Sequence, residues 1–230
     1  LAVFPALGAR RLSREGVLAV ACFVPAFALL LLLAAGDGSD AMARAVAGLL
    51  ALLGLATVAC TAMIYASLAP IPAWRHRATV PGYLLFALLT GGLPMLLAAG
   101  FDAAGFDGAL PFLLAAIAVA LAALKLAYWR DIDRTPLAQS RGDAIGLPAR
   151  KATVFERPHT EANYITREMA FVVARRHARL LRIASLLLFA LLPLLCLGLA
   201  WSQPGVPWAM PVAAGAALAG AFLERWLFFA

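Results

Sequence analysis

Charged residues are scarce in this chain, and that scarcity excludes a water-soluble fold. Asp, Glu, Lys and Arg make up 13% of the 230 residues, whereas 64% are hydrophobic, and the mean hydropathy is +0.90. So little polar surface cannot cover so much apolar surface in water. The two-residue alternation of a membrane β-barrel strand is also missing. Membrane-spanning helices remain, because only helices and closed barrels satisfy the backbone inside a bilayer.

The chain also lacks the residue patterns that hold metals and redox cofactors. Haem b is bound between histidines of facing membrane helices, but all three histidines lie outside the long apolar stretches: His76, His159 and His177. The cysteines occur singly, without a C-x-x-C pair, and are expected to be small packing residues: Cys22, Cys60 and Cys196. No P-loop, G-x-S-x-G or nucleotide fingerprint is present. The sequence therefore predicts no catalytic residue, metal site or haem in this chain.

What the chain does contain is a series of six apolar stretches. A hydrocarbon core about 30 Å thick needs about 20 helical residues. The predicted spans are Gly16–Gly36, Ala45–Leu68, Val80–Gly100, Leu110–Tyr128, Ile183–Trp201 and Val206–Leu223. We therefore expect an all-α, polytopic integral membrane helical bundle, with residues 1–230 as one transmembrane domain.

The charge of the connecting segments alternates in sign. Arginines precede the first span, aspartates dominate the first and third connections, and the second is basic. The fourth, counted from Lys125 to Arg182, holds twelve Lys/Arg against six Asp/Glu. Because Lys and Arg near span ends are retained on the cytoplasmic side, both ends of the chain and the 129–182 loop are predicted to be cytoplasmic, in a bacterial inner membrane. The net charge of +7 then reflects topology, and nucleic-acid binding is not indicated.

This orientation gives a first testable prediction. In a cysteine-free background, a cysteine placed at Arg141 should resist a membrane-impermeant thiol reagent in intact cells, whereas one placed at Asp107 should react. Labelling of both positions after lysis is the control. Labelling of the Arg141 position in intact cells would refute the predicted topology.

Few polar residues lie close to the spans, and each has two interpretations. Glu15, at the start of the first span, has a structural interpretation, in which Ser13 caps the helix and Glu15 is a first-turn charge that stabilises the helix dipole. The functional interpretation is a group that exchanges protons with a quinone. Tyr65 and Trp74 are either members of an aromatic belt or contacts of a quinone ring. Snorkelling to the interface is the ordinary explanation for three further charged residues: Lys125, Glu224 and Arg225.

The 129–182 loop is the one sizeable segment outside the membrane. Its second part, residues 161–182, carries a run of apolar residues followed by a basic cluster that continues into the fifth span. This pattern predicts an interfacial helix that bends into a membrane helix. Its arginines either contact the anionic leaflet or dock a peripheral partner: Arg175, Arg176 and Arg179.

Several motifs resemble one family along nearly the whole chain. They are Leu12–Gly16, Met63–Leu68 with Pro70–Trp74, Pro81–Gly91, Pro158–Tyr164 and Arg175–Arg179. Together they are similar to the anchor subunits of the dimethyl sulfoxide reductase family, including a branch with sulfite dehydrogenase-like relatives.

The resemblance implies an eight-span, haem-free subunit that serves anaerobic electron transport. It would fasten an iron–sulfur subunit and a molybdopterin catalytic subunit to the membrane and exchange electrons with menaquinone or ubiquinone. Glu15 matches the family's acidic residue at the quinol site, and Arg225 matches a basic residue of the last span. The family's first two spans, with a His-Leu-Gly motif, have no counterpart in this sequence.

We therefore expect a quinone-reactive anchor whose molybdopterin active site lies on a partner chain. Two alternatives stay open: a multi-pass transporter or permease, and a purely structural membrane anchor. Against the transporter, the sequence shows neither paired intramembrane charges nor an inverted repeat. A structural anchor fits everything except the position of Glu15.

Overall fold

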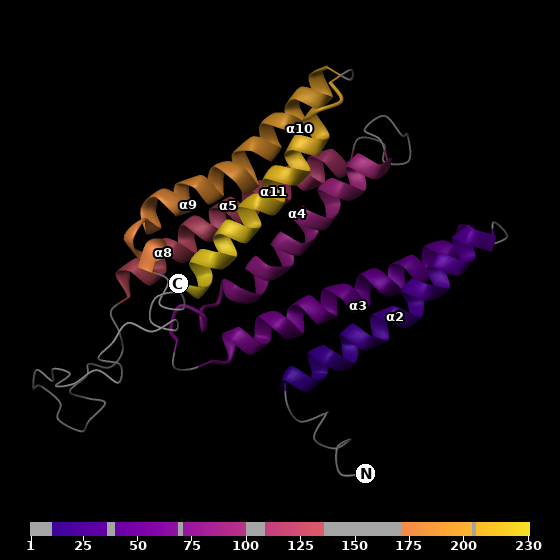
Figure 1. Cartoon of the computed structure of the whole chain (residues 1–230), viewed down its shortest axis with the longest axis horizontal. Coiled ribbons are helices and arrows are strands. Elements are labelled where there is room, and N and C mark those ends of the chain that lie inside the picture. Colours follow the sequence, from indigo (N-terminus) through magenta and orange to yellow (C-terminus); the bar gives the residue numbers. More distant parts are fainter. Residues whose placement is uncertain (1–10, 36–39, 69–70, 100–108, 136–171, 204–205) are drawn as a thin grey trace, which may run out of the picture. The chain divides into compact units, whose positions relative to one another are not determined.

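Every regular element in the part of the chain that the structure describes is a helix. The computed structural model describes residues 11–35, 40–68, 71–99, 109–135, 172–203 and 206–230. The elements are α2 (Arg11–Ala35), α3 (Asp40–Ala66), α4 (Thr79–Ala99), α5 (Ala109–Arg134), α8 (Val172–Arg176), α9 (Ala178–Leu186), the π-helical turn η1 (Leu187–Leu191), α10 (Leu192–Ser202) and α11 (Ala209–Phe229) (Figure 1).

Among these residues, six helices are long and apolar enough to cross a membrane, which confirms the expected fold class. The fifth of them is the continuous run of α9, η1 and α10, from Ala178 to Ser202. Several helices begin before the predicted spans, as at Arg11 and Asp40. Helical backbone hydrogen bonding continues through polar residues, whereas the sequence signal of a span ends with its apolar residues. The span limits and the single domain stay predictions.

The chain forms two compact units, residues 1–88 and 89–230, with the boundary inside α4. In the first unit, α2 and α3 pack along each other (Figure 1). Ala62 of α3 is fully buried. The outer face of α2 exposes large apolar side chains: Val20, Phe23, Val24, Phe27 and Leu30. Such a face is expected of a helix whose solvent is lipid.

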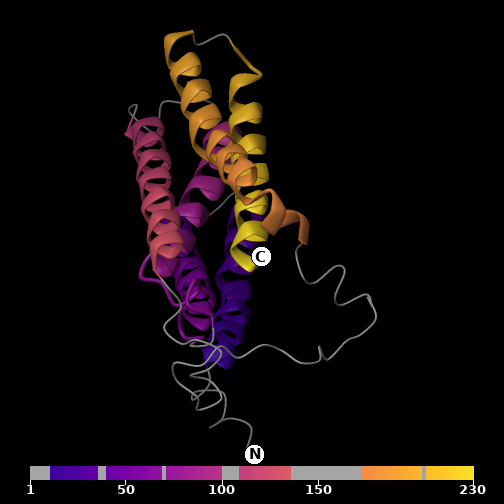
Figure 2. The same ribbon diagram turned by 90° about the vertical axis from the view of Figure 1, so that its left-hand side faces the viewer.

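In the second unit, α11 packs along the bent helix formed by α9, η1 and α10, which also contacts α5 (Figure 2). The two helices come close together at Gly220 of α11, where an added Cβ would lie 2.6 Å from the backbone nitrogen of Phe189. Phe189 belongs to η1, two residues past its start, and Pro193 is the second residue of α10, which follows η1. Proline has no N–H to donate to the carbonyl four residues earlier, and in a regular α-helix its ring clashes with that carbonyl. The wider π-helical turn of η1 relieves this clash.

Candidate functional site

Glu15 lies inside α2 and contacts the neighbouring helix. It is the fifth residue of α2, whose first turn contains no acidic residue. Its half-buried carboxylate accepts a hydrogen bond of 2.6 Å, Oε1 to Oγ1, from Thr61 of α3. The interpretation of Glu15 as a first-turn charge is therefore wrong, because the helix-dipole effect fades beyond that turn. The side chain of Ser13, the expected cap, lies outside the described residues.

Hydroxyl groups continue this polar contact along α3. Thr61 Oγ1 also lies 3.1 Å from the carbonyl oxygen of Thr57, and Thr57 Oγ1 donates to the carbonyl of Leu53 at 2.9 Å. Cys22 Sγ of α2 lies 3.8 Å from Thr57 Oγ1. Back-bonding to the carbonyl four residues earlier lets threonine sit in an apolar helix at little cost. The sequence interpretation missed both threonines, although their four-residue spacing before Tyr65 was a visible signal.

Tyr65, one helical turn after Thr61, is the centre of an aromatic cluster. Its ring meets the edge of Trp74 at 5.3 Å between centroids and stacks on Tyr83 at 5.9 Å with an interplanar angle of 18°. The structure thus brings Tyr65 and Trp74 together, which fits both the aromatic-belt and the quinone-contact interpretation. Tyr83, at the start of α4, was not predicted. Both aromatic rings beside Tyr65 come from residues that follow the end of α3, so they could be grouped only in three dimensions.

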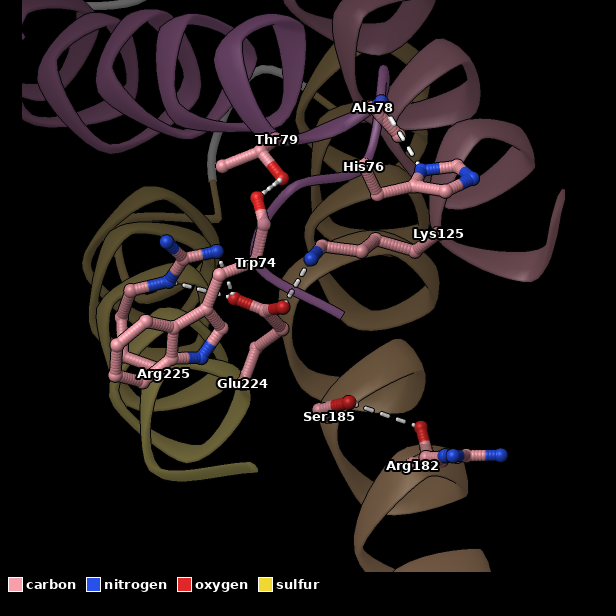
Figure 3. A network of polar contacts seen from close by, with 9 residues as sticks. All are labelled: Trp74, His76, Ala78, Thr79, Lys125, Arg182, Ser185, Glu224 and Arg225. Atoms are coloured by element: carbon pink, nitrogen blue, oxygen red, sulfur yellow. Dashed lines mark hydrogen bonds and ion pairs between the residues drawn. The ribbon is translucent and has the colours of Figure 1, made fainter. Parts of the chain in front are cut away.

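The segment that carries Trp74 is held by short-range hydrogen bonds (Figure 3). Thr79 Oγ1 donates to the carbonyl of Trp74 at 2.8 Å, and the backbone N–H of Ala78 donates to Nδ1 of His76 at 3.1 Å. Thr79 is buried and begins α4. This turn fixes the path of the backbone from which the Trp74 ring extends to Tyr65.

Arg225, the fourth predicted quinone residue, belongs to the second unit and is part of an ion-pair cluster. Its Nε donates to Oε2 of Glu224 at 2.7 Å, and Nη2 pairs with the same oxygen. The other carboxylate oxygen of Glu224 pairs with the ammonium group of Lys125 from α5 (Figure 3). Lys125 and Glu224 are only 4% and 1% exposed. The snorkelling interpretation is therefore wrong for both, because their charged groups pair with each other inside the protein.

The predicted docking arginines surround the junction of α8 and α9. Arg175, Arg176 and Arg179 are all exposed, and a turn at His177 separates the two helices. Arg175 Nε donates to the carbonyl of Ala230 at 2.7 Å. The first part of the predicted interfacial helix, up to residue 171, lies outside the described residues. From Val172 onward, the predicted interfacial helix consists of two helices, α8 and α9, and is not continuous.

Cysteines and other metal-ligating residues do not gather within the described ranges. Cys22, Cys60 and Cys196 are free thiols. Among the described residues, no group of three or more His, Cys, Asp or Glu is placed to hold a metal ion.

Comparison with known proteins gives one match. The family model for the DMSO reductase anchor subunit (DmsC) matches residues 3–230, which is nearly the whole chain. No curated protein and no solved structure matches it. With six apolar helices in the described residues and a family match over almost its full length, the chain belongs to the DMSO reductase anchor subunit family and is a multi-pass membrane protein.

Proposed function

We propose that this chain is the quinone-reactive anchor of a molybdopterin oxidoreductase. Electrons would pass between a membrane quinone, menaquinone or ubiquinone, and the nearest iron–sulfur cluster of a partner subunit. The molybdopterin active site would lie on a further subunit. Family membership supports the coarser part of this statement, a membrane anchor subunit of DMSO reductase-type complexes.

The observation that carries the quinone assignment is the arrangement around Thr61. On one side its hydroxyl binds the carboxylate of Glu15, and one helical turn along α3 lies Tyr65 with its aromatic neighbours. A quinone head group needs flat apolar surface for its ring and polar groups for its oxygens. Aromatic rings with phenol or indole groups supply the flat apolar surface and some of the polar groups. A carboxylate at the edge of the apolar region supplies a proton acceptor.

In this proposal Glu15 is the group that exchanges protons. Oxidation of one quinol releases two electrons and two protons. The electrons leave toward the partner's cluster, and the protons need a route to water. A carboxylate within hydrogen-bond reach of the quinol oxygen is suited to accept a proton and release it at the membrane surface. In the direction of quinone reduction the same group would deliver the proton.

The side of the membrane follows from the same placement. Glu15 lies near the start of α2, on the side to which the charge pattern assigns the cytoplasm. Because electron transfer requires the quinone to lie near the partner's closest cluster, the iron–sulfur subunit would also dock on the cytoplasmic side. We therefore favour a sulfite dehydrogenase-like assembly over an exported reductase with the same kind of anchor.

Two other functions were open from the sequence. The buried cluster of Lys125, Glu224 and Arg225 removes one argument against a transporter, since it supplies paired charges within the helices. Family membership nevertheless favours an anchor. A purely structural anchor would lack a quinone-dependent role for Glu15.

Co-purification tests the proposal as a whole. A tagged form of this chain, extracted in mild detergent, should bring down subunits that contain molybdenum and iron in fixed ratio to the chain. The complex should reduce or oxidise a quinone analogue, and a soluble redox dye that bypasses the anchor serves as the control. Purification of the chain without metal-containing partners, or a complex that reacts with the dye alone, would contradict it.

A further inference from the structure

A basic cleft lies where the end of α5 meets α8 and the start of α9. Its lining residues are Asp133, Arg175, Arg176, His177, Ala178, Arg179, Leu180 and Arg182. In the described part of the chain, Asp133 is the one acidic residue among those that line it. Arg182 already binds both oxygens of this carboxylate, at 2.6 and 3.0 Å. The remaining arginines therefore leave the cleft strongly positive, which suits a ligand with a negatively charged group.

The cleft continues into an apolar surface. Leu180 lines the cleft and is exposed, and further exposed residues follow it at intervals of three or four positions along α9, η1 and α10: Ile183, Leu187, Leu191 and Leu195. This spacing places them on one face of the bent helix. Arg182 also lies over the ring of Trp129, 5.5 Å from its centroid. Trp is enriched at the boundary between hydrocarbon and head groups.

We infer that the cleft binds the phosphate of an anionic phospholipid whose acyl chain lies along this apolar stripe. A guanidinium group offers paired donors that match phosphate oxygens. A ligand with a charged end and a long apolar end matches both surfaces at once. A peripheral protein that approached from water would use the arginines alone. The sequence left two roles open for Arg175, Arg176 and Arg179, contact with anionic lipid and docking of a peripheral partner. The contacts favour the lipid.

Lipid binding by the purified full-length chain tests this inference. Phosphatidylglycerol and phosphatidylcholine with the same acyl chains are titrated, and bound lipid is counted by native mass spectrometry. The cleft variant is Arg176→Gln with Arg179→Gln. The matched control is Arg130→Gln with Arg134→Gln, which removes the same charge from exposed positions of α5 outside the cleft. Inorganic phosphate and glycerol phosphate, as competitors, distinguish a lipid from a free anion.

We expect the parent to prefer phosphatidylglycerol over phosphatidylcholine. The cleft variant should lose affinity for it by about twenty-five-fold, since each of the two arginines contributes about fivefold near an anionic surface. The control pair should change the affinity by less than about threefold. Leu180→Gln should weaken phosphatidylglycerol binding and leave the weak effect of free phosphate unchanged.

Three results would overturn the inference. Equal loss in the cleft and control variants would mean that general surface charge attracts the lipid. Full competition by inorganic phosphate at low concentration would mean an anion site without an acyl component. Unchanged lipid binding in a cleft variant that no longer co-purifies with its peripheral subunits would assign these arginines to docking.

Discussion

Replacing Glu15 by glutamine should slow quinone-linked electron transfer by about a hundredfold, within the range that a positioned proton-exchanging group contributes. The substitution keeps the size of the side chain and an oxygen that can still accept the 2.6 Å hydrogen bond from Thr61. Only the ability to take up and release a proton is lost. The measurement is turnover of the membrane-bound complex with a quinone analogue, compared with turnover of the same preparation with a redox dye that bypasses the anchor.

Thr61 supplies the matched controls. Thr61→Ser keeps the hydroxyl that donates to Glu15 and should retain most quinone-linked activity. Thr61→Val keeps the shape and removes the hydroxyl. It should lower quinone-linked kcat by less than Glu15→Gln does, because the carboxylate can still take up a proton and loses only the hydrogen bond that positions it. Dye-linked activity should be the same in all three variants. If Glu15→Gln matches the parent with the quinone analogue, Glu15 has a structural role and the proposed site is wrong.

Removing the carboxylate of Glu224 should destabilise the second unit by about 3–5 kcal/mol, the usual cost of breaking a buried ion pair from one side. Glu224→Gln leaves the cations of Lys125 and Arg225 in an apolar bundle without the negative charge that both contact. Lys125→Met should cost less, because Glu224 then keeps Arg225 as its partner. Reversible unfolding in mixed detergent micelles, followed by helical circular dichroism, measures both variants.

The double variant Lys125→Met with Glu224→Gln should be more stable than Glu224→Gln alone, since one of the two orphaned cations is gone. An exposed ion pair of the same unit gives the matched control. Asp133 is 57% exposed in its pair with Arg182, so Asp133→Asn should cost less than about 1 kcal/mol. Equal stability of Glu224→Gln and the parent would show that the cluster is not held as the structure has it.

Much of the architecture followed from residues that act locally. Each span is recognised from its own run of apolar side chains, because the bilayer acts on every segment separately. The helical fold with six long apolar helices is confirmed in the described residues, and so is the family resemblance. Orientation also follows from neighbouring charges and stays a prediction. Tyr65 and Trp74 were singled out by residue type and position, and the structure joins them.

The partners of the polar side chains were decided only by tertiary packing. Glu15 and Thr61 are 46 residues apart on different helices, and nothing in the pattern of either helix specifies which turn of one faces which turn of the other. The same holds for Lys125 and Glu224. Taken separately in the sequence, each is interpreted as an interfacial charge, whereas in the structure they form a buried ion pair. The sequence shows which positions around each helix are apolar. Which polar groups meet depends on the rotation and offset at which two helices pack, and close contacts such as Gly220 against Phe189 set these only in the folded chain.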